Sequence, residues 1–199
     1  MNTMIKVCGM ADADNIRDVE VLGVDMIGFI FYPKSPRYLY QIPRYLPTLA
    51  KRVGVFVNET KENILMYVDR FGLNYVQLHG DESPEYCRTL HSQGIRIIKA
   101  FSIKTAEDIE KALQSPADYI LLDQGGGGTG KTFDWSLIPE IQRPFFLAGG
   151  IGAANLEQAI REIHPYAVDL SSSVETEKWK DPTKIRQVVD SVRKMKETK

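Results

Sequence analysis

Short apolar runs recur along the whole chain, and each is followed by a polar segment with helical periodicity or by a loop. Runs of four to seven residues between turn-forming residues are typical of strands that are buried on both faces of a sheet. Eight strands are predicted, over residues 4–7, 25–31, 52–57, 74–78, 95–100, 119–122, 144–148 and 167–170.

Between these runs, the apolar positions follow a helical period. Helices are predicted over residues 12–22, 43–50, 61–71, 83–93, 105–114, 153–163 and 182–196, with room for at most a short helix around 135–141. Asp12 is a suitable N-cap for the first helix, which has Ile16 and Val19 on its apolar face. Ser83 followed by Pro84 suits the start of another.

Alternating strands and helices predict a parallel sheet that is covered by helices. Eight such units favour a closed (β/α)8 TIM barrel, a single domain over residues 1–199, with a shortened segment after the sixth strand. An open doubly wound sheet needs only about five or six strands and would leave the others unplaced. The chain is short for this barrel, so its loops and helices must be compact.

Composition narrows the classes of partner. The 199 residues carry a formal net charge of -1 and have no long charged run apart from a mildly basic C-terminal turn, so nucleic acid and anionic membrane are poor candidates. Two cysteines are too few for a disulfide framework or a structural zinc site. No secretory signal or membrane-spanning apolar run is visible, and we expect a cytoplasmic protein.

The segment from Tyr119 to Trp135 is the most distinctive part of the chain. Its apolar run ends on a carboxylate, Asp123, and five glycines follow within residues 125–130. In parallel α/β folds the catalytic groups lie at the carboxyl ends of the strands, and a glycine-rich loop can close over a ligand. The alternative interpretation is a glycine linker that follows an exposed aspartate.

Other polar side chains also gather at the carboxyl ends of the predicted strands, and residues two apart in a strand share a face. The residues that share a face in this way are Lys6 and Cys8; Gln77 and His79; Leu121 and Asp123; and Ala167, Asp169 and Ser171, while Lys99 lies near the end of its own strand. This clustering favours a catalytic end. A structural salt bridge between Lys6 and Asp169 is the alternative for part of it, although unpaired buried charges are costly.

Several short signatures occur in order along the chain. They are Lys6-Val-Cys-Gly-Met10, Gly28-Phe-Ile-Phe-Tyr-Pro-Lys-Ser-Pro-Arg-Tyr38, Val53-Gly-Val-Phe-Val-Asn58, Val76-Gln-Leu-His-Gly-Asp-Glu82, Leu122-Asp123 before Gly127-Gly-Thr-Gly130, Phe133-Asp-Trp135, Leu147-Ala-Gly-Gly-Ile151 and Val168-Asp-Leu-Ser-Ser172. Together, and over essentially the whole length, the sequence resembles the phosphoribosylanthranilate isomerases, the barrel enzymes of tryptophan biosynthesis.

The resemblance implies an Amadori rearrangement that needs no metal and no cofactor. N-(5-phosphoribosyl)anthranilate becomes 1-(2-carboxyphenylamino)-1-deoxyribulose 5-phosphate. An acid protonates the furanose ring oxygen as the ring opens, and a base removes the proton from C2. By resemblance the acid is Asp123 and the base is Cys8.

Cys8 alone would usually be a small buried apolar residue. Lys6, on the same face, favours the thiolate that a base needs. Asp123 has the opposite requirement, because a general acid must hold its proton near neutral pH, and a desolvated position would assist this.

Further residues are expected to bind the substrate. Arg37, in a loop stiffened by two prolines, is expected to bind the anthranilate carboxylate through paired hydrogen bonds, and Asp169 to bind a substrate hydroxyl. His79 either lies in the core or lines the site. Lys34, His91 and His164 are expected at the surface and Cys87 in the core.

Two loops are expected to bind the substrate phosphate through backbone N–H groups, as in other phosphosugar barrels. Gly149 and Gly150 follow the seventh strand, and Ser171, Ser172 and Ser173 follow the eighth. The family usually has glycine where this chain has Ser173. Since a serine at positive φ would be strained, we expect Ser173 to have a negative φ.

Other functions remain open from the sequence. A lyase or epimerase could act on another phosphosugar, but an epimerase usually has metal-binding His and Asp residues at strand ends, and only His79 is a histidine at such a position. A non-catalytic sensor would need no acid and base at Asp123 and Cys8. The choice between monomer and homodimer, and the acceptance of a second sugar phosphate, are not determined by the sequence.

Overall fold

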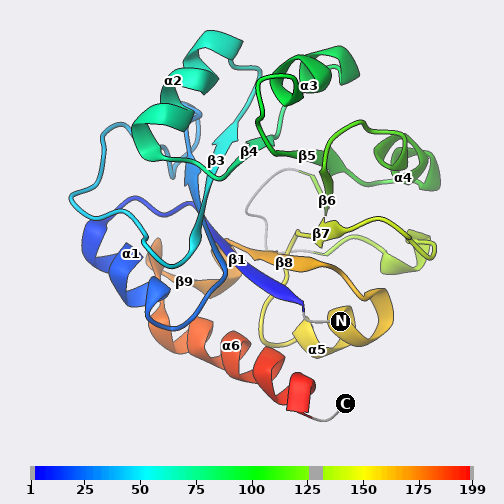
Figure 1. Cartoon of the computed structure of the whole chain (residues 1–199). Coiled ribbons are helices and arrows are strands. Elements are labelled where there is room, and N and C mark those ends of the chain that lie inside the picture. Colours follow the sequence, from blue (N-terminus) through cyan, green and yellow to red (C-terminus); the bar gives the residue numbers. More distant parts are fainter. Residues whose placement is uncertain (1–2, 126–131, 198–199) are drawn as a thin grey trace.

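The computed structural model describes residues 3–125 and 132–197. Eight parallel strands close into a barrel in sequence order, with β8 paired to β1, and helices surround it (Figure 1). The strands are β1 (Met4–Cys8), β2 (Met26–Ile30), β3 (Lys51–Phe56), β4 (Tyr75–Leu78), β5 (Ile97–Ser102), β6 (Tyr119–Asp123), β7 (Phe145–Leu147) and β8 (Ala167–Leu170). This confirms the predicted (β/α)8 TIM barrel.

The outer layer is helical. Its members are α1 (Ala13–Glu20), α2 (Lys61–Phe71), α3 (Pro84–His91), α4 (Ala106–Leu113), the short α5 (Leu156–Gln158) and α6 (Pro182–Glu197). Asp12 and Ser83 cap α1 and α3 as predicted, since each side chain accepts a backbone N–H of the first turn. The last helix, α6, packs beside α1 where the barrel closes (Figure 1), and Arg193 donates to the carbonyl of Leu22 at 3.2 Å.

Alternate residues of each strand face the helices or the barrel interior. Outward residues form the larger apolar core under the helices, and inward residues such as Met26 and Leu121 form a smaller one. Because both faces of the strands are buried, the strands appear in the sequence as short, nearly continuous apolar runs.

Aromatic rings fill the amino-terminal end of the barrel interior. The rings of Tyr119 and Phe146 pack edge to face with their centroids 5.7 Å apart. The Tyr119 ring also lies 5.9 Å from that of Tyr75 and 5.2 Å from that of Tyr166. These contacts add to the stabilisation that burial of the rings provides.

The helix predicted over residues 43–50 is wrong, because these residues have no helical structure. Pro47 has no N–H, and the N–H groups of Leu49 and Ala50 donate to the Glu20 carboxylate at 2.6 and 2.8 Å instead of to a preceding turn. A side chain of α1 thus supplies the acceptors that a local helix would have supplied.

Two other segments differ from the prediction. The helix predicted over residues 153–163 starts later, and α5 continues as the π-helical turn η2 (Ala159–Ile163). After β8, the 3-10 turn η3 (Ser172–Val174) and the antiparallel hairpin of β9 (Glu175–Thr176) and β10 (Trp179–Lys180) were not predicted. Between β6 and β7, the described residues 124–125 and 132–144 contain one helix, the short 3-10 helix η1 (Trp135–Leu137), in agreement with the prediction.

Most of the glycine-rich segment after Asp123, residues 126–130, lies outside the described residues. Closure of this loop over a ligand therefore stays a prediction. Within residues 3–125 and 132–197, no helix has the length and apolar character needed to cross a membrane.

Candidate active site

A pocket of about 440 Å³ opens at the carboxyl ends of the strands. The ten residues that the sequence suggested for catalysis or binding all line it: Cys8, Arg37, His79, Asp123, Gly149, Gly150, Asp169, Ser171, Ser172 and Ser173. They come from both ends of the chain and its middle. Barrel closure therefore brings them together.

Cys8 ends β1 with its side chain inside the barrel. The neighbouring inward position on β2 is Gly28, where a Cβ would lie only 2.8 Å from the Cys8 Sγ, so the glycine leaves the space that the thiol occupies. Lys6 lies on the same face, fully buried, with its Nζ 2.7 Å from Oδ2 of Asp169. The structural salt bridge considered for these two residues is therefore present.

Burial and the neighbouring ammonium groups shift the pKa of the Cys8 thiol in opposite directions. Burial raises the pKa of the Cys8 thiol, and the ammonium groups of Lys6 and Lys180 offset this only in part. Burial alone would lower the pKa of Lys6, but Asp169 and Cys8 outweigh it and raise that pKa, so Lys6 carries its charge beside the thiol. Lys6 favours the thiolate as predicted, yet the neutral thiol predominates at neutral pH.

Asp123 ends β6 and is buried at the edge of the pocket. Its Oδ2 lies 3.5 Å from Nε2 of His79, and Nδ1 of His79 lies 3.0 Å from Nε2 of Gln77. The two ring nitrogens of His79 thus face different partners, the Gln77 amide on one side and the Asp123 carboxyl group on the other. His79 lines the pocket, and its side chain is 35% exposed.

The loops after β7 and β8 both line the pocket. Gly149 has a φ of +80°, and a Cβ there would lie 2.9 Å from Oδ1 of Asp123, so glycine lets this loop pass close to the carboxyl group. Ser173 lies in η3 and does not have a positive φ, which confirms the prediction for this residue. Its hydroxyl donates to the carbonyl of Ile151 and ties the two loops together.

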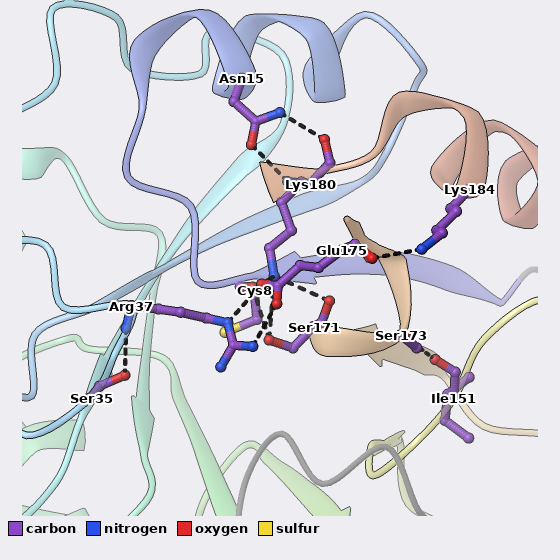
Figure 2. A network of polar contacts seen from close by, with 10 residues as sticks. All are labelled: Cys8, Asn15, Ser35, Arg37, Ile151, Ser171, Ser173, Glu175, Lys180 and Lys184. Atoms are coloured by element: carbon purple, nitrogen blue, oxygen red, sulfur yellow. Dashed lines mark hydrogen bonds and ion pairs between the residues drawn. The ribbon is translucent and has the colours of Figure 1, made fainter. Parts of the chain in front are cut away.

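Two charged residues beside the pocket were missed from the sequence. Glu175 begins the β9–β10 hairpin and Lys180 ends it, and Figure 2 shows both converging with Arg37 near Cys8. Glu175 accepts hydrogen bonds from Arg37 and from Lys180. The available signal for Glu175 was its position two residues after Ser173, whereas no sequence pattern marked Lys180.

The remaining candidates lie elsewhere. Lys99 points outward from the barrel, where its Nζ donates to the carbonyl of Gly80 at 2.6 Å and to Glu82 at 3.0 Å. Lys34, His91 and His164 are exposed and Cys87 is buried in the core, as predicted. In the described part of the chain, no group of three or more His, Cys, Asp or Glu residues is placed to hold a metal ion.

Comparison with known proteins decides the family. The family model for N-(5'phosphoribosyl)anthranilate (PRA) isomerase matches residues 5–191. The chain belongs to this family. The PRA isomerase of Phocaeicola vulgatus is 44% identical over 182 residues, which cover 87% of this chain and 89% of that protein. The PRA isomerase of Parabacteroides distasonis is 42% identical over 206 residues, covering 95% and 93%.

Solved PRA isomerases share the fold. The Thermotoga maritima structure superposes with a TM-score of 0.86 at 38% identity, covering 96% of this chain and 99% of that one. A PRA isomerase in complex with reduced 1-(o-carboxyphenylamino)-1-deoxyribulose 5-phosphate gives 0.84 at 36% identity with the same coverage. The family resemblance inferred from the sequence signatures is confirmed.

Proposed function

We propose that this PRA isomerase family member converts N-(5-phosphoribosyl)anthranilate to 1-(2-carboxyphenylamino)-1-deoxyribulose 5-phosphate in tryptophan biosynthesis, with Cys8 as base and Asp123 as acid. The reaction follows from membership of the family. The assignment to residues is supported by one observation above all: β1 and β6 are three strands apart around the barrel, and both side chains line one pocket. An acid and a base that act on different atoms of one substrate need this separation.

In the first step, protonated Asp123 donates its proton to the ring oxygen as the C1–O bond breaks. The anthranilate nitrogen forms a C=N bond to C1 at the same time. In the second step, the Cys8 thiolate removes the proton from C2, the C–H electrons form a C1=C2 bond, and the C=N electrons return to nitrogen. The resulting enolamine gains a proton at C1 and loses its C2 hydroxyl proton to give the ketone.

The substrate's charged and polar groups have matching partners around the pocket. Arg37 would bind the aryl carboxylate, and the loops at Gly149-Gly150 and Ser171–Ser173 would bind the phosphate. Asp169 uses Oδ2 for Lys6, while its buried Oδ1 has no hydrogen-bond partner among the described residues. That oxygen is available to accept from a substrate hydroxyl.

A turnover assay tests the proposal directly. Substrate is generated in place from anthranilate and phosphoribosyl pyrophosphate, and its consumption is followed by fluorescence. We expect steady turnover by the purified chain. Binding of the substrate without turnover would indicate a sensor instead of an enzyme.

Metal-free chemistry has a separate test. We expect EDTA to leave the rate unchanged, because Cys8 and Asp123 supply the base and the acid without a Lewis acid. Inhibition by EDTA that added metal reverses would contradict this.

Assembly and location stay predictions. The structures similar to this one include monomers generated from a dimeric Thermotoga maritima PRA isomerase, and the choice between monomer and homodimer stays open for this chain. The single-domain organisation over residues 1–199, the cytoplasmic location and the absence of a nucleic-acid partner are likewise expectations from the sequence.

A further inference from the structure

The Glu175 carboxylate is bonded to two cations at once. It accepts from Nε and Nη2 of Arg37, each at 2.6 Å, and Oε1 also accepts from Nζ of Lys180 at 2.6 Å. Its side chain is 8% exposed. Burial alone would raise the pKa of Glu175, but the hydrogen bonds from Arg37 and Lys180 lower it to about 2. Glu175 is therefore an anion at every pH at which an enzyme would normally work.

Glu175 lies behind Arg37, because Arg37 lines the pocket and Glu175 does not. A guanidinium has five N–H groups in one plane, and Glu175 accepts one from Nε and one from Nη2. Nη1 points away from Glu175 (Figure 2). Among the described residues, the Arg37 side chain donates only to Glu175, so the end formed by Nη1 and the second N–H of Nη2 is left for a ligand.

Glu175, which accepts the hydrogen bonds from Arg37, is held in place by further contacts. Nζ of Lys180 also lies 3.2 Å from the carbonyl of Ser171, and Lys184 donates to the Glu175 carbonyl at 2.6 Å. The Asn15 side chain of α1 donates to the carbonyl of Lys180 at 2.8 Å and accepts from its N–H at 3.2 Å. Figure 2 shows these contacts on both sides of Glu175. The carboxylate is therefore fixed through its side chain, its backbone and its hairpin.

We infer that Glu175 is a positioning residue that holds the Arg37 guanidinium in the orientation that binds the aryl carboxylate end-on through Nη1 and Nη2. The inference rests on the proposed function, which gives Arg37 this carboxylate. A free arginine side chain loses rotamer entropy when it binds a ligand. Because Glu175 already restricts the Arg37 side chain in the free protein, less rotamer entropy is lost on binding. Loss of Glu175 should therefore weaken substrate affinity more than it slows the chemical step.

The first experiment replaces Glu175 by glutamine, which keeps the size but loses the charge and the second acceptor oxygen. We expect Glu175→Gln to raise KM, and the Kd for reduced 1-(o-carboxyphenylamino)-1-deoxyribulose 5-phosphate, about tenfold, while kcat changes less than about threefold. The matched control is Glu85→Gln on α3. Glu85 accepts two hydrogen bonds from Arg88 in an exposed pair, and its loss should change neither constant.

A double-mutant cycle separates positioning from general structural damage. If Glu175 acts through Arg37, Glu175→Gln changes KM and Kd less than about twofold in an Arg37→Ala background. A purely structural role would instead give about the same tenfold change in both backgrounds, and that result would overturn the inference.

The outcomes for the inference and for the proposed function can be told apart. An inactive wild-type chain overturns the proposed function and the inference with it. An active wild type with unchanged KM and Kd in Glu175→Gln overturns the inference alone. If that variant fails to fold, Glu175→Asp keeps the charge beside Lys180 but withdraws the carboxylate by one methylene, and unchanged constants there have the same meaning.

Discussion

The two ends of the barrel interior are built on the same eight strands from opposite kinds of residue. At the amino end, the rings of Tyr119 and Phe146 pack against each other without charge. At the carboxyl end, Cys8 and Asp123 face a pocket, and a salt bridge takes the place of apolar packing. Close packing at one end offsets the desolvation cost of the charges at the other. Substitutions at the two ends should therefore separate stability from activity.

Phe146→Ala should give the largest loss of stability. The ring is fully buried at the apolar end, and its removal is expected to lower the free energy of unfolding by about 3–5 kcal/mol. The folded fraction should keep kcat within about twofold, because the ring does not line the pocket. Chemical denaturation and steady-state kinetics measure the two quantities. A large loss of kcat at unchanged stability would mean that the two ends are not separable.

Cys8→Ser and Asp123→Asn should show the opposite pattern. Each is expected to lower kcat at least about 10²-fold, equivalent to about 2.7 kcal/mol in the barrier, with little change in KM. The free energy of unfolding should change little. Near-normal turnover in either variant would remove that residue from the mechanism.

Lowering the pH should reduce the stability that the Glu175 charge contributes at the carboxyl end of the barrel. The pKa of Glu175 is about 2 in the folded protein and about 4.5 when unfolded, so the folded form binds its proton less readily. Its contribution to stability is complete above about pH 4.5 and is lost as the pH falls through about 2. The difference in unfolding free energy between wild type and Glu175→Gln should therefore shrink across this window. A difference that stays constant would contradict the assignment of the charge.

The pH dependence of turnover tests the state of Cys8. Burial raises the pKa of this thiol, and the base must be deprotonated to act. We expect kcat/KM of the Asp123→Asn variant, in which the acid no longer titrates, to rise about tenfold per pH unit and not to level off below the range in which a free thiol titrates. Alkylation by iodoacetamide in a Cys87→Ala background should follow the same curve. A plateau near pH 7 in both measurements would show that Lys6 and Lys180 lower the pKa of Cys8 by more than burial raises it.

Ser173→Gly should have the smallest effect. Ser173 already has a negative φ, so glycine relieves no strain there. We expect KM to change less than about threefold, a difference under about 1 kcal/mol. A tenfold drop in KM would show that the serine impairs phosphate binding.

The fold and the inward-facing site residues could be predicted because their signals are local. Strands buried on both faces leave short apolar runs, and the two-residue period places Cys8 and Asp123 on the inner face. The helix expected over residues 43–50 failed because its backbone donors are satisfied by Glu20, which is far away in sequence. No local pattern carries that information.

Glu175 and Lys180 could not be predicted for the same reason. Their strands have two residues each, too few to show a period, and the bond from Arg37 to Glu175 spans 138 positions. The tight turn that brings them together depends on positive φ at Glu177 and Lys178, which are not residues that usually mark such a turn.

Long-range hydrogen bonds where the barrel closes join residues 6–22 to residues 169–193. Lys6 bonds to Asp169, Asn15 to Lys180 and Arg193 to Leu22, at separations of 163, 165 and 171 positions. A polypeptide leaves the ribosome amino end first, so Lys6 emerges long before its counter-ion has been made. Contacts of such long range also form slowly in refolding. The candidate active site can therefore form only after Asp169 and Lys180 have been made, and activity during translation should not begin before that point.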